Sequence, residues 1–208
     1  ETASGQTWSC SFTVTVIDEE APVITCPEAI SQNTDDGECA AIIELDLPEV
    51  SDNCTDIPTI SYRVFNPDHS LSPWYGSASN TYTFSLGISQ VEWKVEDEFG
   101  NTTFCLQEVE ILEVPVTVDA GSDMGICAGQ SYQLNGSVTN ALTFEWSTSG
   151  TGSFDNPNAL NPVYTPSYGD ILDIQVTLTL TAIGSCSTVS DQMVLTIFPP
   201  PVANAGID

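Results

Sequence analysis

Short segments in which apolar and polar residues alternate constrain the fold of this chain more than any other feature. Alternation with a period of two residues is the pattern of a β-strand that buries one face. These segments are rich in Val, Ile, Thr and aromatic residues, and clusters of Gly, Pro, Asn and Asp bound them, as is usual for strands. They lie at residues 11–17, 40–45, 59–65, 81–86, 91–95, 107–112, 131–134, 142–146, 174–182 and 192–198.

No stretch of the sequence shows an apolar repeat of helical period over three turns. Many short strands separated by turns, with no helices between them, are typical of β-sandwiches. The sequence therefore predicts an all-β fold built from sandwiches, and a total of 208 residues leaves room for one or two domains.

Two internal similarities divide the chain into repeated modules. Residues 5–17 (GQTWSCSFTVTVI) align without a gap with residues 100–112 (GNTTFCLQEVEIL), and DAGSD at 119–123 aligns with NAGID at 204–208. We therefore predict the last strand of a preceding module at 1–17, complete modules at 18–113 and 114–198, and a linker with the start of the next module at 199–208. The chain resembles a slice from a tandem array.

The net charge excludes several classes of partner. The chain carries 29 Asp and Glu but only two Lys and Arg, for a formal charge of −27. Nucleic-acid binding needs cations that neutralise phosphates, and an anionic membrane would repel this chain. No apolar run approaches the roughly 20 residues of a membrane-spanning helix, so direct membrane insertion is not expected. With 41% hydrophobic residues, the chain can nevertheless form folded cores.

Seven cysteines and a single histidine indicate disulfides rather than a zinc site. No CxxC pair occurs, and spread cysteines in a β chain are typical of an oxidising compartment. From the expected positions of the strands at the two ends of each sandwich, we predict the pairs Cys26–Cys54, Cys39–Cys105 and Cys127–Cys186. Cys10 aligns with Cys105, so its partner should lie in the preceding module and it should be unpaired in this segment.

The first module resembles the hyalin repeat (HYR) family. The matching residues are DEEAPVITCP at 18–27, DGECAA at 36–41, SDNC at 51–54 and DEFGN at 97–101, followed by Cys105. The resemblance covers nearly all of 18–113 and implies an immunoglobulin-like extracellular module associated with adhesion. The stretch 66–79 departs from the family because it is longer and richer in Ser, Pro and aromatic residues.

The second module is similar to the PKD/immunoglobulin-like repeats of Bacteroidetes surface proteins. The similarity lies in AGSD at 120–123, WSTSGTGSF at 146–154, NPVYTPS at 161–167 and Cys186, although PKD modules usually have WDFGDG-like residues where WSTSGTG stands. Alternation of the two module types resembles giant flavobacterial gliding-motility adhesins. This implies type IX secretion, attachment at the bacterial outer-membrane surface, and as partners neighbouring repeats, an extracellular surface or polysaccharide, and motility or anchoring machinery.

The sequence offers no catalytic constellation, and we expect no enzyme activity. It has no Ser-His-Asp order with a nucleophile elbow and no phosphate-binding loop that leads into a helix. We expect a structural segment of a cell-surface adhesin filament. The alternative is a glycan- or calcium-dependent ligand-binding module, and a more distant one is an accessory domain of a secreted hydrolase.

Calcium is the cofactor that the acidic residues suggest, although nothing in the sequence requires one. The ion takes six to eight oxygen ligands, often from several carboxylates. Acidic residues stand where the first module begins, and a later loop should return to the same end of the sandwich. The candidate ligands are Asp18, Glu19, Glu20, Asp52, Asn53 and Asp56. For glycan contact the candidates are Trp74 and Tyr75, which lie in a long polar loop where they could stack on sugar rings.

Overall fold

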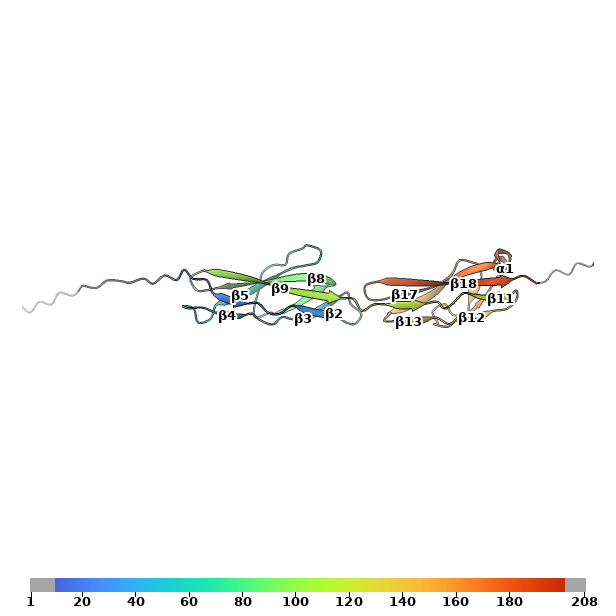
Figure 1. Ribbon diagram of the computed structural model, residues 1–208, viewed down its shortest axis with the longest axis horizontal. Helices are drawn as coiled ribbons and strands as arrows, with labels where there is room; N and C mark the ends of the chain where they lie inside the picture. Colours follow the sequence, from blue (N-terminus) through green and yellow to red (C-terminus); the bar gives the residue numbers. More distant parts are fainter. Residues whose placement is uncertain (1–9, 201–208) are drawn as a thin grey trace, which may run out of the picture. The chain divides into compact units, whose positions relative to one another are not determined.

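The computed structural model describes residues 10–200, which form strands and one short helix (Figure 1). This confirms the all-β prediction. The first nine strands are β1 (Val23–Thr25), β2 (Ile30–Asn33), β3 (Ala40–Glu44), β4 (Glu49–Ser51), β5 (Thr59–Phe65), β6 (Tyr75–Gly76), β7 (Thr81–Ser85), β8 (Gly87–Glu96) and β9 (Thr102–Leu112). The remaining elements are β10 (Thr117–Asp119), β11 (Met124–Cys127), β12 (Tyr132–Gln133), β13 (Ser137–Thr139), β14 (Thr143–Thr148), β15 (Ser153–Phe154), β16 (Val163–Thr165), α1 (Tyr168–Asp173), β17 (Gln175–Ile183) and β18 (Thr188–Phe198).

The same strand plan occurs twice along the chain. Strands β1 to β9 form a five-stranded sheet in the order β2-β9-β8-β5-β6, together with the pairs β1-β4 and β3-β7. Strands β10 to β18 form a four-stranded sheet in the order β11-β18-β17-β14, together with β10-β13 and β12-β16-β15. In both sets the first strand belongs to a separate pair, β1 with β4 and β10 with β13. The second strand of each set lies beside the last strand in the larger sheet, β2 beside β9 and β11 beside β18. This is the plan of an immunoglobulin-like sandwich.

The alternating sequence explains which faces of the strands are buried. In β17 every second residue from Val176 to Ala182 is buried, and the Thr residues between them are half-buried. Val176, Leu178 and Leu180 contribute to one hydrophobic core together with Trp146 and Tyr164. A single shift of register would expose the whole apolar set, so the pattern fixes how β17 pairs with its neighbours.

A second set of core residues surrounds Trp93 on β8, whose side chain is fully buried. Its ring lies 5.2 Å from that of Tyr62 on β5. The indole Nε1 donates to Oε1 of Gln107 at 3.1 Å, and Nε2 of Gln107 donates to the carbonyl of Glu28 at 2.7 Å. The buried indole N–H of Trp93 is therefore satisfied, as burial of a polar group requires.

The described chain divides into two compact units whose limits cut across strands. The first unit contains the chain up to Ile30, Glu44–Tyr82 and Ile88–Val109, and the second contains Ser31–Ile43, Thr83–Gly87 and the chain from Glu110 onward. The module limits 18–113 and 114–198 therefore stay predictions. The predicted strand at 11–17 is assigned to no sheet over the residues described, and the proposed repeats at 5–9 and 204–208 lie outside those residues.

The sequence did not predict α1, which is a single helical segment of six residues. Ser167 caps it in a capping box with Asp170, and the helix ends at Ile174, whose φ is 67°. A helix this short has no room for an apolar repeat, and two cap residues define it instead. The predicted strand 174–182 consequently begins one residue later, at Gln175.

The structure corrects all three predicted disulfides. It joins Cys26 to Cys105, and it joins Cys39 to Cys186, both of which belong to the second compact unit. The free cysteines among the described residues are Cys10, Cys54 and Cys127.

The strand register explains why Cys26 and Cys54 do not meet. In the antiparallel pair of β1 and β4, Val23 lies opposite Ser51 and Thr25 lies opposite Glu49. Cys26 therefore continues toward the beginning of β4, whereas Cys54 lies beyond its end. The same kind of argument applies to Cys39 and Cys105. Thr34, just before the turn that leads to Cys39, donates its N–H to the carbonyl of Leu112, roughly 23 Å along β9 from Cys105.

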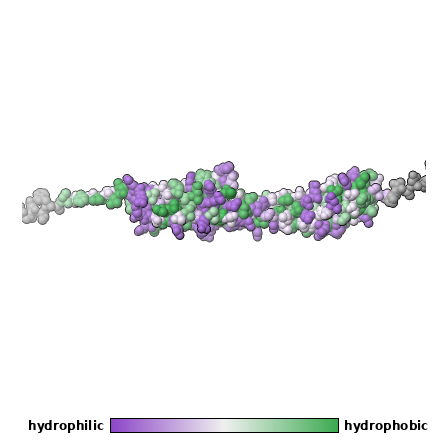
Figure 2. All heavy atoms as spheres, viewed as in Figure 1, coloured by the Kyte–Doolittle hydropathy of each residue, from purple (hydrophilic) through white to green (hydrophobic). Residues whose placement is uncertain are grey.

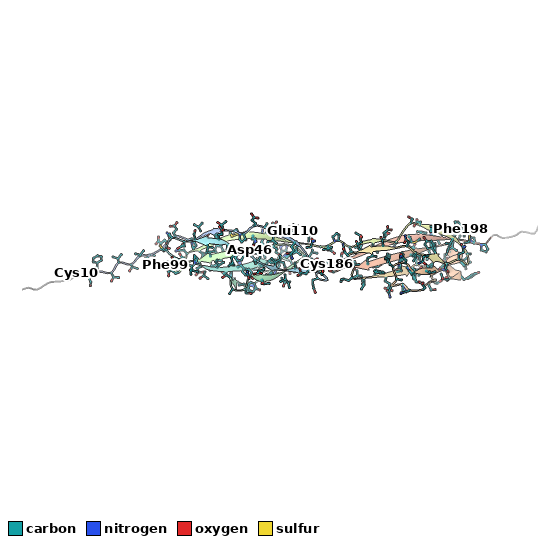
Figure 3. All side chains as sticks on the ribbon, turned by 90° about the horizontal axis from the view of Figure 1, so that it is seen from below. Cys10, Asp46, Phe99, Glu110, Cys186 and Phe198 are labelled. Atoms are coloured by element: carbon teal, nitrogen blue, oxygen red, sulfur yellow. A yellow bond between two sulfur atoms is a disulfide. The ribbon has the colours of Figure 1, made fainter. Side chains whose placement is uncertain are left out.

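Cys127 and Cys186 lie near opposite ends of β18. Strand β11 pairs in parallel with β18, and this places Cys127 opposite Phe198. Cys186 precedes Thr188, where β18 begins, and Figure 3 shows Cys186 and Phe198 well apart. Eleven residues of strand separate the two positions, about 35 Å, which a disulfide cannot bridge.

No helix among residues 10–200 has the length and apolar character needed to cross a membrane.

Candidate metal centre

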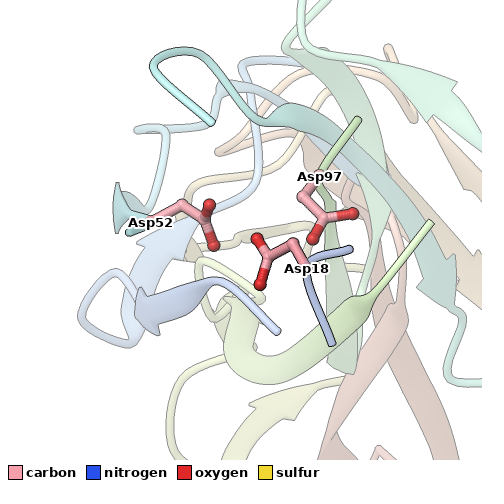
Figure 4. Close-up of side chains that lie close together, drawn as sticks. All are labelled: Asp18, Asp52 and Asp97. Carbon is pink, nitrogen blue, oxygen red and sulfur yellow. The ribbon is translucent and has the colours of Figure 1, made fainter. Parts of the chain in front are cut away.

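Three aspartates from separate parts of the chain meet at one end of the first compact unit (Figure 4). Asp18 precedes β1, Asp52 directly follows β4, and Asp97 directly follows β8. One carboxylate oxygen from each lies within 4.8 Å of the others. We call these three residues the aspartate cluster.

Asp18 is buried and incompletely satisfied. Only 8% of the residue is exposed, and its Oδ1 accepts a hydrogen bond from the backbone N–H of Glu20 at 3.1 Å. Its Oδ2 is buried and has no hydrogen-bond partner. A buried carboxylate oxygen without a partner is costly, because the charge has lost water and gained nothing in return.

Asp97 is held in its charged form by donors from its own turn. Its Oδ1 accepts from the N–H groups of Phe99 at 2.9 Å and Asn101 at 2.8 Å, and its Oδ2 accepts from Nδ2 of Asn101 at 2.8 Å. Burial acts to raise the pKa of Asp97, but these hydrogen bonds outweigh it and lower the pKa overall. The same Nδ2 donates to the backbone carbonyl of Asp18 at 3.0 Å, which joins the two residues.

Asp52 closes a turn directly after β4. Its Oδ2 accepts from the backbone N–H groups of Cys54 at 2.9 Å and Thr55 at 2.7 Å, a local arrangement common for aspartate in turns. The exposed Cys54 thiol lies near the cluster. Its pKa is raised by partial desolvation first, then by the negative charge of Asp18 and a side-chain hydrogen bond to Asp18, and then by the negative charges of Asp52 and Glu20.

Sequence reasoning found part of this cluster. Asp18 and Asp52 belong to it as predicted, whereas Glu19 and Asp56 are exposed and outside the group. Nδ2 of Asn53 donates to Oε2 of Glu20 at 2.6 Å, so these two candidate ligands pair with each other.

Asp97 is the residue that the sequence analysis missed. The signal was present in DEFGN at 97–101, a motif that contributes to the resemblance to the hyalin repeat. Asp97 can join Asp18 and Asp52 only because the end of β8 lies near them in the folded chain. The strand order shows this, and the sequence alone does not.

The cluster concentrates negative charge where no cation of the chain can balance it. The chain has one Arg and one Lys; Arg63 pairs with Glu92 and Lys94 with Glu96, each at 2.5 Å. Two like charges 4.8 Å apart repel by about 3.5 kcal/mol at an effective dielectric constant of 20. An arrangement of oxygen ligands alone suits a hard cation such as Ca²⁺, for binding rather than catalysis. A hollow lined by Glu20, Ala21, Val23, Ser51, Asp52 and Asn53 opens Asp52 to solvent.

The structure separates the two predicted glycan contacts. Trp74 is 41% exposed, but its ring has neighbours within the chain: Cζ of Arg63 lies 4.7 Å from the ring centroid, and Phe104 lies 6.4 Å away. Tyr75 is half-buried and packs on Tyr62 at 5.3 Å. Trp74 thus remains available to a ligand on part of its surface, whereas Tyr75 also packs within a group of aromatic rings. Glycan contact at both residues stays a prediction.

Comparison with known proteins gives similarity of structure only. No protein-family model and no curated protein matches the sequence. Among solved structures, the titin domains Z1Z2 in complex with telethonin align with 89% of this chain and 100% of theirs, at 12% identity and a TM-score of 0.38. Extracellular domains 3–5 of Drosophila OTK align with 90% and 71% at 13% identity and a TM-score of 0.33. Human CDH23 EC21-23 aligns with 86% and 69% at 12% identity and a TM-score of 0.33.

Proposed function

We propose that this chain is a non-catalytic, structural segment of an extracellular adhesion protein built from repeated immunoglobulin-like modules. The observation that carries the proposal is the segment that precedes β1. Phe12, Val14 and Val16 alternate with polar residues and are 85%, 70% and 74% exposed. Figure 2 shows hydrophobic surface along this segment.

The internal repeat aligns the segment before β1 with strand β9. In the alignment of 5–17 with 100–112, the three exposed residues match Gln107, Val109 and Ile111 of β9, which are almost fully buried. Cys10 matches Cys105, which is bonded to Cys26. An apolar face in the register of a buried strand is best explained as the last strand of another copy of the module.

A chimeric chain tests this proposal directly. Placing a copy of residues 18–99 before Gly5 would supply the rest of the proposed module, and residues 10–17 should then pair as its last strand. We expect their backbone amides to exchange with deuterium at least about tenfold more slowly than in the original chain. We also expect a disulfide between Cys10 and the copied Cys26.

Paired variants of the chimera provide the control. Val14→Asp would place a charge on the face to be buried and should abolish the protection, whereas Thr13→Asp, on the other face of the strand, should retain most of it. Exchange that stays as fast in the chimera as in the original chain would argue against the repeat.

The finer proposal is that the whole protein is a bacterial surface filament of the gliding-motility type. Its support is the resemblance of both modules to those of giant flavobacterial adhesins, with the implied type IX export and outer-membrane attachment. A charge of −27 also suits an array of modules, since neighbouring filaments would repel each other at low salt.

Antibody labelling of cells that produce the protein tests its location. Antibodies raised against this segment should label intact, unpermeabilised cells, and the label should move along cells that glide. Labelling that requires lysis of the cells would refute a surface filament, and an immobile label would refute the motility role alone.

A further inference from the structure

We propose that Asp18, Asp52 and Asp97 together bind one calcium ion, and that this ion fastens the segment leading into β1 to the ends of β4 and β8. This inference goes beyond the proposed function, because the site would exist whether or not the module belongs to an array. Figure 4 shows the three carboxylates directed toward a common space.

The first observation that points to a ligand is the unpartnered oxygen of Asp18. The residue is more than nine-tenths buried, and the oxygen that lacks a partner belongs to the group of carboxylates that lie within 4.8 Å of one another. The other oxygen of the same side chain and the backbone carbonyl of the residue are both hydrogen-bonded. The structure therefore holds Asp18 in place through one carboxylate oxygen and the backbone, and leaves the other carboxylate oxygen without a hydrogen bond.

Hydrogen bonds fix the other two carboxylates of the cluster. Three donor groups converge on the carboxylate of Asp97, and two backbone N–H groups converge on Oδ2 of Asp52. These donors belong to the turns that follow β8 and β4, and they hold both side chains in place beside Asp18. The ligand positions are therefore set by the fold before any ion binds.

The chemistry of the ligands selects the class of cation. Carboxylate oxygens suit Ca²⁺, whose flexible coordination can be completed by water and backbone carbonyls. Structural zinc sites are built mainly from nitrogen and sulfur ligands, and among the described residues Cys54 offers a thiol beside the cluster. The strict octahedron of Mg²⁺ is harder to meet with carboxylates from three separate segments.

Bound calcium would connect three segments at once. Asp18 follows the exposed residues 10–17, whereas Asp52 and Asp97 follow strands of the folded sheets. The hydrogen bond from Asn101 already ties the backbone of Asp18 to the turn after β8. An ion would add bonds to both strand ends and fix the direction in which the chain enters the unit.

Calorimetric titration of the EDTA-treated 208-residue protein with CaCl₂ tests the site. We expect one ion per chain with a Kd of about 10⁻⁴–10⁻³ M, the range of extracellular calcium modules. Asp18→Asn should weaken binding at least about tenfold, and Asp56→Asn should leave it within about twofold. Asp56 is exposed in the same loop as Asp52, so this control removes the same charge without removing a ligand.

Thermal unfolding separates loss of the ion from loss of the fold. Without calcium, Asp18→Asn should melt at or above the temperature of the unaltered protein, because the change removes a buried carboxylate oxygen that has no hydrogen bond. With about 10 mM calcium, the unaltered protein should gain stability and the variant should not. The variant should therefore melt below the unaltered protein only when calcium is present.

Three outcomes would overturn the proposal. One is the absence of both binding heat and a melting shift at about 10 mM calcium. Another is an equal loss of binding in Asp56→Asn and Asp18→Asn, which would mean that diffuse charge attracts the ion. The third is tighter binding of Zn²⁺ that Cys54→Ser abolishes, which would make the cluster a thiolate site.

Discussion

Replacing Cys26 and Cys105 together by Ala should lower the free energy of unfolding of the first compact unit by about 4 kcal/mol. The disulfide closes a loop with a sequence separation of 79 residues, and the entropy that such a link removes from the unfolded chain grows with the length of the loop. Urea denaturation followed by tryptophan fluorescence measures the change, because Trp93 lies in the core of that unit.

Cys127→Ala is the matched control for this variant. Cys127 is exposed and free, so its replacement should change the free energy of unfolding by less than about 0.5 kcal/mol. Peptide mapping without reduction checks the connectivity itself. A peptide that links Cys26 to Cys54 would contradict the structure, and so would a double variant as stable as the unaltered protein.

Asp170→Asn should destabilise the second compact unit by about 3 kcal/mol. Asp170 is 1% exposed, and its Oδ2 accepts from the hydroxyl of Tyr164 at 2.7 Å and from the N–H of Ser167 at 3.0 Å. Its Oδ1 accepts from the N–H of Thr151 at 2.8 Å. The asparagine amide has one accepting oxygen and one donating nitrogen, whereas the carboxylate has two accepting oxygens. The nitrogen would replace one of these oxygens, and the backbone N–H that donates to it would lose its acceptor.

The same residue should make stability depend on pH. Burial acts to raise the pKa of Asp170, but the hydrogen bonds from Tyr164, Thr151 and Ser167 outweigh it and lower the pKa. A carboxyl with a lowered pKa contributes stability above its ordinary pKa of about 4 and loses it as the pH falls through the folded value. Burial chiefly raises the pKa of Tyr164 to about 12, so its hydroxyl remains a donor throughout this range.

Unfolding measured in urea between about pH 2 and pH 7 tests both parts of this prediction. Asp170→Asn should reduce stability at neutral pH and flatten its decline in acid. Asp173→Asn is the control, because Asp173 lies exposed at the end of the same helix and should leave both quantities nearly unchanged. Equal effects of the two substitutions would assign the change to helix charge rather than to the network.

The sequence predicted long strands better than short ones. Alternation located β17 and β8 because each contains several buried residues at every second position. It missed β6 and β15, which have two residues each and owe their existence to neighbours already in place. Pairing with a longer strand supplies the hydrogen bonds that such short segments need, and this information is not local in the sequence.

Long-range pairs were the least predictable feature. The disulfides were placed by assigning each cysteine to one end of a sandwich, and that assignment failed where the register of β1 with β4 decided the outcome. The aspartate cluster was partly predictable because Asp18 begins a module and Asp52 lies in a turn. Asp97 required knowledge of where β8 ends.

The parallel pairing of β11 with β18 determines how the set of strands β10 to β18 would respond to tension. The chain reaches β11 directly after β10 and leaves the set after Phe198 at the end of β18, and β11 and β18 run in the same direction. A force that draws the two chain ends apart would slide one strand along the other, so the hydrogen bonds between them would share the strain and resist together. In an antiparallel hairpin pulled open from one end, they would break one at a time. The set β10 to β18 would therefore yield abruptly at high force rather than unravel gradually.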